Sequence, residues 1–285
     1  MSLFTAVEMA PRDPILGLNE QFNADTNPNK VNLGVGVYFD DNGKLPLLQC
    51  VQAAEKTMMS TPTARGYLPI DGIVAYDNAV KSLVFGADSE PVQSGRVATV
   101  QAIGGTGGLK IGADFLKKLS PNAKVLISDP SWENHRALFT NAGFEVGTYA
   151  YYDAEKRGVN FDGFLASLNA AAPGTIVVLH ACCHNPTGYD ITPEQWDQVI
   201  AAVKAKNLTP FLDMAYQGFG HGIAEDGAVI GKFVAAGLNF FVSTSFSKSF
   251  SLYGERVGGL SVLCADKEEA SRVLSQLKIV IRTNY

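Results

Sequence analysis

Short apolar runs recur along this chain, and segments of helical periodicity separate them. Runs without alternation of apolar and polar residues are typical of strands that are covered on both faces. We expect seven strands on this basis. They lie at Val97–Ile103, Lys124–Ser128, Glu145–Tyr151, Thr175–Ala181, Thr209–Asp213, Phe240–Ser245 and Gly259–Cys264.

Helical patterns fill the gaps between these runs. Leu109, Ala113 and Leu116 recur at helical spacing. Trp196 follows Thr192–Glu194, a helix start signal with proline in the first turn. The alternation predicts an α/β fold, in which helices sandwich a mostly parallel seven-stranded sheet.

Both ends of the chain depart from this alternation. Residues 1–40 are rich in turn residues around Asp25–Asn29 and lead into Val31–Tyr38. We interpret 1–40 as an N-terminal arm with part of a second, small domain, and 41–285 as one large domain. A long amphipathic helix is expected over Lys267–Ile281, shortly before the last residue.

Composition narrows the class of protein. With 285 residues, 46% of them apolar, the chain can bury a large core. The net charge of −5 and the lack of a Lys/Arg run argue against nucleic acid or an anionic membrane as partner. The four cysteines include no CxxC pair, which is typical of a reducing compartment. We find neither a signal peptide nor an apolar run that would cross a membrane, and we expect a cytoplasmic protein.

Polar and glycine-rich loops come directly after the predicted strands. They are Gly104–Gly108, Asp129–His135, Cys182–Gly188, Asp213–Tyr216 and Ser245–Ser249. In open α/β sheets, ligands bind beyond the carboxyl ends of the strands, so we expect these loops to converge. Together they supply anion binders, an aromatic plate, a carboxylate, a phenol, an amide and an amine. A phosphorylated aromatic cofactor with a reactive aldehyde needs such a set.

Lys248 stands between Ser247 and Ser249, just after an apolar strand. Most lysines are solvated surface groups, and that alternative applies here too. The strand context and the nearby Arg256 favour another role, in which two hydroxyls and a guanidinium hold a phosphate beside the amine. A partly desolvated lysine beside a cation has a lowered pKa, which suits Schiff-base chemistry.

The other loop residues each have a structural alternative. Gly104–Gly108 opens a helix and is either a flexible turn or a phosphate site, with neither the GxGxxG nor the P-loop spacing. Asp213 is either a helix N-cap or the partner of a pyridinium nitrogen. Tyr216 and Trp132 are either packed aromatic residues or groups that contact a cofactor ring.

The segment Cys182–His184 raises the question of a metal site. Adjacent cysteines at a strand end are expected to point to opposite sides, and the chain has no second Cys/His pair. We interpret these cysteines as core residues and expect no metal. Asn185–Pro186 then makes a rigid turn that aims the Asn185 amide. A hydrolase has little support, because no Gly-x-Ser-x-Gly segment occurs.

Three motifs resemble the aspartate/aromatic aminotransferases, which are fold-type-I enzymes that use pyridoxal 5'-phosphate (PLP). The motifs are Cys182–Gly188, Asp213–Phe219 and Ser245–Gly258. The resemblance extends from Asp13–Leu16 to Arg282–Tyr285, which is nearly the whole chain.

The resemblance is closer to one branch of the family. Ser128–His135 and Tyr253–Ser261 are more similar to the bacterial tyrosine/aromatic-amino-acid aminotransferases than to the strict aspartate branch.

The resemblance also implies a role for each matching residue. Lys248 would bind PLP as a Schiff base and then act as general acid and base. Asp213 would pair with the pyridine nitrogen, supported by His135. Asn185 and Tyr216 would bind the ring oxygen. The other implied contacts are Trp132 on the ring, Gly105, Thr106, Ser245, Ser247 and Arg256 at the phosphate, and Tyr67 of the neighbouring subunit, also at the phosphate.

The implied substrate-binding residues are Gly36, Trp132, Asn185 and Arg282. Arg282 would cross a subunit interface to bind a distal carboxylate, so the resemblance implies an obligate homodimer with shared active sites. Residues 41–285 would be the large PLP-binding domain. Family members continue past Tyr285 into a small C-terminal domain that is absent from this sequence. If the molecule ends at Tyr285 we expect PLP binding at best, with poor turnover, and if the molecule continues we expect normal activity.

We therefore expect an aminotransferase that moves the amino group of aromatic amino acids, aspartate or both to 2-oxoglutarate by a ping-pong mechanism. The alternatives are a strict aspartate aminotransferase and a truncated PLP-binding chain with little turnover. A PLP-dependent lyase or decarboxylase agrees less well with Arg282, which suits a dicarboxylic substrate. A non-catalytic partner-binding protein and a nicotinamide dehydrogenase have less support, the latter because its glycine spacing is missing.

Overall fold

The computed structural model describes residues 2–11, 16–32, 34 and 36–285, and the chain divides into two compact units at Leu47/Leu48. We describe each unit by itself. Residues 13–15 of the N-terminal family motif lie outside the described residues. The first unit contains helix α1 (Leu16–Ala24), and the Lys30 ammonium donates to the Phe22 carbonyl oxygen at 2.5 Å.

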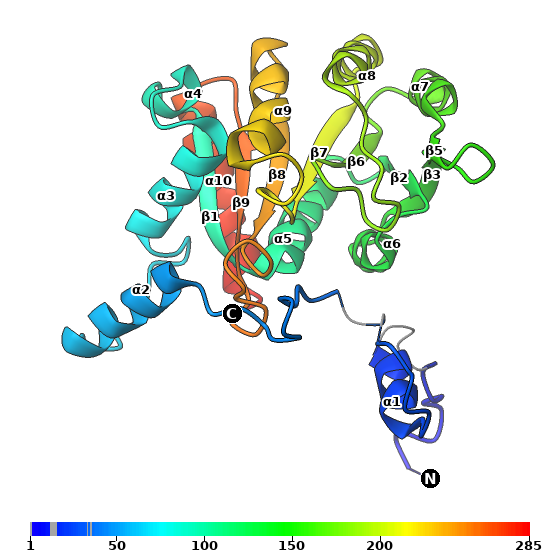
Figure 1. Ribbon diagram of the computed structural model, residues 1–285. Coiled ribbons are helices and arrows are strands. Elements are labelled where there is room, and N and C mark those ends of the chain that lie inside the picture. Colours follow the sequence, from blue (N-terminus) through cyan, green and yellow to red (C-terminus); the bar gives the residue numbers. More distant parts are fainter. Residues whose placement is uncertain (1, 12–15, 33, 35) are drawn as a thin grey trace. The chain divides into compact units, whose positions relative to one another are not determined.

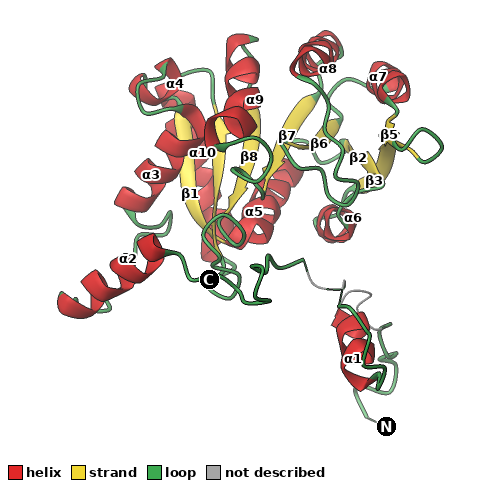
Figure 2. Ribbon diagram, viewed as in Figure 1, coloured by secondary structure: helices red, strands yellow, loops and turns green. Residues whose placement is uncertain are grey.

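The second unit is built around a mostly parallel sheet, which in the described residues has seven strands (Figure 2). In spatial order the strands are β1 (Val97–Ile103), β9 (Val257–Leu263), β8 (Phe240–Ser245), β7 (Thr209–Met214), β6 (Ile176–His180), β2 (Lys124–Asp129) and β3 (Glu145–Ala150). Strand β9 runs antiparallel to both of its neighbours, and the other pairs are parallel. The predicted fold class is confirmed, with strand ends that differ by one or two residues.

The last sheet strand begins earlier than predicted, at Val257 instead of Gly259. Glycine is a weak strand signal, so Gly258 separates Val257 from the rest of the predicted run. Gly258 is needed there because a Cβ atom at this position would lie 2.3 Å from the carbonyl carbon of Gly104. Strand β9 therefore lies directly against the loop that follows β1.

Helices cover both faces of the sheet (Figure 1). One core cluster draws on α3 (Val74–Phe85), α7 (Phe161–Ala170), α8 (Pro193–Ala205) and α9 (Ile223–Ala235). A second cluster draws on α5 (Gly104–Leu119), α6 (Glu133–Asn141) and α10 (Lys267–Arg282). The remaining elements are α2 (Gln49–Ser60), α4 (Glu90–Gln93) and a hairpin of β4 (Tyr152–Asp153) with β5 (Gly158–Val159). The chain as described has no helix with the length and apolarity to cross a membrane.

Local signals explain where the helices begin. Helix α8 starts with a capping box, in which Thr192 and Gln195 each accept from the other's backbone N–H, and proline stands in its first turn. Asp266 caps α10 by accepting from the Glu269 N–H at 2.7 Å. Both helices were expected from the sequence, α8 from its start signal at Thr192–Glu194 and α10 from its amphipathic pattern.

Strand register brings the loops to one edge of the sheet. Asp213 on β7 pairs with His180 on β6 and with Ser243 on β8. The end of β8 meets the start of β9, where Ser245 pairs with Gly258. Because β1 runs in the same direction as β8, its last residues lie at this edge too. The predicted convergence of the loops follows from this register.

Candidate active site

A glycine cradle lies where β1 passes into α5. Gly104 has a left-handed φ of 65°, and its N–H donates to the Arg256 carbonyl oxygen at 2.7 Å. A Cβ atom on Gly104 would lie 2.8 Å from Arg256 Nη2, and one on Gly105 would lie 2.9 Å from Ser245 Cβ. The missing side chains let a guanidinium and a serine approach the first turn of a helix, where Thr106 also lies. A helix N-terminus beside a cation binds phosphate well.

The loop after β8 adds further polar groups to this cradle. Arg256 donates to the Ser247 hydroxyl at 3.3 Å and to the Tyr253 carbonyl oxygen at 3.2 Å. The Ser245 hydroxyl accepts from the Ser247 N–H at 3.3 Å. The structure thus brings together Gly105, Ser245, Ser247 and Arg256, which the family resemblance assigned to the phosphate.

Asp213 is a buried strand residue with a fixed partner. Its carboxylate lies 2.8 Å from Nε2 of His135, and Nδ1 of that imidazole lies 2.9 Å from the Ser131 hydroxyl. Both Asp213 and His135 are buried. Asp213 belongs to β7, whereas Gly222 is the N-cap of α9, so the alternative of a helix cap is wrong. A buried carboxylate held in this way is suited to pair with a cationic ring nitrogen.

Lys248 is half-buried, with its ammonium 5.0 Å from the centre of the Tyr216 ring. Burial is the main cause that lowers the pKa of Lys248. The Asp213 carboxylate opposes that shift, and the Arg256 guanidinium adds to it. The alternative of a solvated surface lysine is therefore wrong. A lowered amine pKa increases the fraction of neutral, nucleophilic amine.

Tyr216 and Asn185 meet from two different loops. The Asn185 amide donates to the Tyr216 hydroxyl at 3.4 Å. Burial, and after it the nearby Asp213 carboxylate, raises the pKa of Tyr216, so its phenol stays protonated and can donate. Trp132 packs at the edge of the same site. The centres of the Trp132 and His135 rings are 5.2 Å apart, and the two rings are nearly perpendicular.

His180 belongs to the site and was missed in the sequence. It is in register with Asp213, and one of its ring nitrogens lies within 4.8 Å of donor atoms of His135 and Asp213. Burial, reinforced by His135 and His184, holds the pKa of His180 well below its usual range. The only available signal was a single polar residue at the end of an apolar strand.

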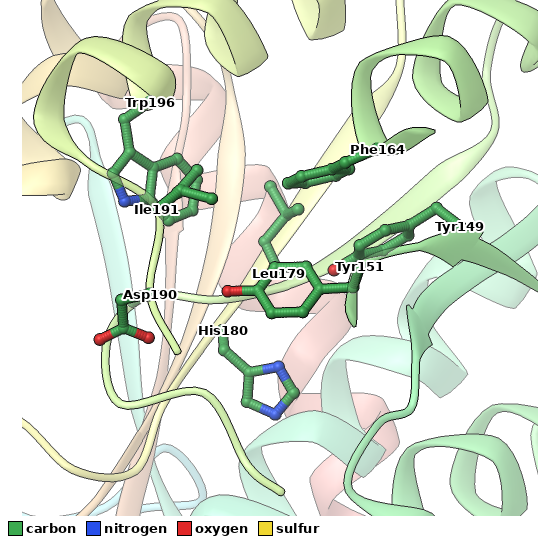
Figure 3. Close-up of a pocket in the computed structure, with 9 residues that line it drawn as sticks. Tyr149, Tyr151, Phe164, Leu179, His180, Asp190, Ile191 and Trp196 are labelled. Atoms are coloured by element: carbon green, nitrogen blue, oxygen red, sulfur yellow. The ribbon is translucent and has the colours of Figure 1, made fainter. Parts of the chain in front are cut away.

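His180 also faces a small pocket of about 10 Å³, roughly the size of one water molecule, beside Tyr151 and Asp190 (Figure 3). Neither ring nitrogen of His180 has a hydrogen-bond partner among the described residues. This imidazole is a neutral and polar neighbour of the Asp213 carboxylate.

The remaining predicted site residues are Tyr67, Arg282 and Gly36. Tyr67 and Arg282 are exposed and line an open pocket of about 770 Å³, whose wall also includes Arg256. Gly36 is exposed and lies in the first unit. These are the residues whose implied partners lie in another subunit or another domain.

The prediction that Cys182 and Cys183 point to opposite sides is wrong. Their sulfur atoms lie within 4.8 Å of each other and of a carboxylate oxygen of Asp226. Strand β6 ends at His180, and Cys183 takes a left-handed φ of 50°. Strand alternation no longer applies at these positions, so the two side chains can turn to the same side.

Comparison with known proteins decides the family. The model of the family described as aminotransferase class I and II matches residues 28–285. The chain belongs to the class I and II aminotransferases. This aminotransferase is 64% identical over 285 residues to an aspartate aminotransferase of Pseudomonas aeruginosa. The matched region covers all of this chain and 72% of that relative.

Aromatic-amino-acid aminotransferases are similar too. The Escherichia coli enzyme of that name is 52% identical over 284 residues, which are 99% of this chain and 72% of the relative. A crystal structure of the aromatic-amino-acid aminotransferase of Burkholderia pseudomallei, covalently bound to pyridoxal phosphate, superposes with a TM-score of 0.98. The two sequences are 68% identical over 100% of this chain and 71% of that one. The predictions of the family and of an aminotransferase enzyme are confirmed.

Proposed function

We propose that this aminotransferase binds PLP through Lys248 and moves amino groups from aromatic amino acids, aspartate or both to 2-oxoglutarate in a ping-pong reaction. The observation that carries the proposal is the position of the Lys248 amine. It is half-buried, and the Asp213 carboxylate and the Arg256 guanidinium both act on it. A ring nitrogen and a phosphate are the two groups of PLP that these charges suit.

The described residues are compatible with the shape and the charge of PLP. The cradle at Gly104 and Gly105 has no room for a Cβ atom and is lined by Arg256 and Ser245. The ring-nitrogen partner would be Asp213. When bound, PLP supplies an electron sink for the bonds at the substrate Cα.

The protein's own groups then have distinct tasks. Asp213 would keep a proton on the ring nitrogen through its negative charge, and His135 orients that carboxylate. The Lys248 amine would take the proton from the substrate Cα and deliver it to C4′ of the cofactor. Asn185 and Tyr216 would donate to the ring oxygen. Thr106, Ser245, Ser247 and Arg256 would hold the phosphate with the first turn of α5, and Trp132 would stack on the ring.

Arg282 and Tyr67 support a homodimer with shared active sites. Both are exposed side chains, and they share a pocket with Arg256. We assign Tyr67 to the phosphate of a second copy, and Arg282 to the distal carboxylate of a dicarboxylic substrate. Gly36 would line the substrate pocket together with Trp132.

The proposal also includes the domains and the cellular location. We assign residues 1–40 to an arm and part of a small domain, and 41–285 to the PLP-binding domain; the two compact units divide nearby, at Leu47/Leu48. A cytoplasmic location agrees with the four free cysteine thiols, all of which lie in the described residues.

A strict aspartate aminotransferase is the second candidate. It is favoured by the 64% identity to an aspartate aminotransferase. The two candidates differ in whether an aromatic side chain is accepted, which the rates of the half-reaction measure directly.

An absorption spectrum tests the proposed function. The PLP-loaded protein is mixed with phenylalanine or with aspartate, without a keto acid. We expect the band of lysine-bound PLP to be replaced by that of pyridoxamine phosphate, and the faster amino acid identifies the substrate class. Lys248→Ala should still bind PLP but lose at least about a thousandfold in transfer rate, because it lacks the general base. Full transfer by Lys248→Ala would overturn the proposal.

A further inference from the structure

Two adjacent thiols and a buried carboxylate meet close to the proposed cofactor loops. The sulfur atoms of Cys182 and Cys183 and a carboxylate oxygen of Asp226 all lie within 4.8 Å of one another. Cys182 and Asp226 are buried, and Cys183 is partly exposed. None of these three side chains has a task in the proposed aminotransferase reaction.

A strained turn holds the two sulfur atoms on the same side. Cys183 has a φ of 50°, a conformation that costs a non-glycine residue about 1 kcal/mol or more. The Asp190 carboxylate supports the turn by accepting from the N–H groups of Cys183 and His184, at 2.6 and 2.8 Å. The Cys183 sulfur also lies 3.8 Å from the Tyr216 carbonyl oxygen. The paired thiols are thus a built feature of this loop.

The third group carries a negative charge. The Asp226 carboxylate accepts from the N–H groups of Gly218, Gly220 and His221 at 2.8, 2.9 and 2.9 Å. Three backbone N–H donors around this buried carboxyl favour its ionised form. The site therefore presents an anionic oxygen beside two sulfur atoms.

We propose that Cys182, Cys183 and Asp226 bind a soft divalent cation such as Zn²⁺ or Cd²⁺. Two sulfurs and one carboxylate oxygen are ligands that such ions prefer, and the partly exposed Cys183 leaves a fourth position open to solvent. In a tetrahedral zinc site the ligand atoms are separated by roughly 3.4–3.8 Å. The donor atoms lie within 4.8 Å of one another, so they need to approach by at most about 1.4 Å, which rotation of the side chains can supply. The cation replaces the two thiol protons, and both protons are released to solvent.

This cation site adjoins the proposed cofactor site without sharing a side chain with it. Cys183 precedes Asn185 by two positions and touches the backbone of Tyr216. Binding of a cation can therefore be measured whether or not PLP is bound, and its outcome is independent of the proposed function.

The test uses Cd²⁺ and the full chain as purified. Cadmium bound to thiolates has a charge-transfer band in the ultraviolet, and calorimetry gives its affinity and stoichiometry. The reference is a Cys50→Ser/Cys264→Ser variant, which removes the two thiols that lie outside the site. We expect this reference to bind one Cd²⁺ per chain with a charge-transfer band.

Adding Cys183→Ser to the reference should weaken Cd²⁺ binding at least about tenfold and reduce the band, since even an indirect partner of a metal contributes that much. Cys183 is partly exposed, so its conversion to serine is expected to leave the fold intact, which circular dichroism checks. Equal binding with and without Cys183, or no band in the reference, would overturn the proposal. Asp226→Asn is a poorer test, because this carboxylate also holds its own turn.

Discussion

Lys248 is half-buried, and the charges of Asp213 and Arg256 both act on its amine. Its neighbours set its chemistry, since burial lowers the pKa of an amine and a second cation lowers it further. Lys118 on α5, by contrast, is exposed to solvent. Lys248 differs from it because Lys248 has lost part of its hydration and lies near other charges.

Stability measurements on the PLP-free protein can detect this burial. The folded-state pKa of Lys248 is below the usual value of 10.5, so the unfolded chain binds more protons between these two pKa values. The cost of burying the charged amine is therefore fully present below the folded pKa and is lost as the pH rises towards 10.5. We expect Lys248→Met to be more stable than the unsubstituted protein at neutral pH, with a difference that shrinks at alkaline pH.

Urea unfolding at several pH values measures that difference. Lys118→Met is the matched control, because it removes an exposed lysine from the same unit. A stability difference for Lys248→Met that does not change with pH would show that the amine is not desolvated.

At the scale of elements, the site depends on how closely α5 approaches the ends of β8 and β9. Gly105 touches Ser245 on β8, and Gly108 lies where a Cβ atom would be 2.6 Å from the Gly259 carbonyl oxygen on β9. Glycine at these two positions is therefore explained by close packing. The first turn of the helix reaches Ser245 and Arg256 for this reason.

Gly105→Ala tests whether this approach matters for binding. Its Cβ atom would lie 2.9 Å from Ser245 Cβ, so the helix must shift, at a cost of about 1–3 kcal/mol. We expect PLP to bind at least about fivefold more weakly, because the shift moves the phosphate groups apart. Gly107→Ala is the control in the same turn, since its nearest neighbours would lie at 3.4 Å. Titration with PLP, followed by absorbance, compares the two variants, and equal affinities would contradict the expectation.

At the scale of the whole molecule, Tyr67 and Arg282 line a pocket together with Arg256, one of the two charges that act on Lys248. Both are exposed and point into an open pocket. A pair of copies with C₂ symmetry would place each exposed group in the other copy's site. In this proposal each active site needs residues from both copies, so an activity measurement on mixed dimers can test the homodimer.

Two inactive variants should restore activity when they are refolded together. In a mixed dimer of Lys248→Ala and Arg282→Ala, one site receives the intact Lys248 of one chain and the intact Arg282 of the other. Random pairing makes this site roughly a quarter of all sites, so about a quarter of the unsubstituted activity should return. Refolding each variant alone is the control. A mixture that is no more active than its components would show that the sites are not shared.

Several features were predictable from the sequence because they depend on near neighbours along the chain. Apolar runs such as Val97–Ile103 predict strands that are covered on both faces, and Thr192 with Pro193 predicts the start of α8. Parallel strands with polar residues at their carboxyl ends predict one shared site, and Asp213 and Lys248 lie at that edge.

Only the tertiary structure decided which alternative applied to each residue, since partners in space are remote in sequence. Asp213 is the partner of His135, 78 positions away, and not a helix cap. His180 joined the site through strand register, which a single apolar run does not contain. The two thiols met because Cys183 has a left-handed backbone, held by Asp190 seven positions later. Burial, charge and register depend on the packed molecule, and so do the pKa of Lys248 and the grouping of the cysteines.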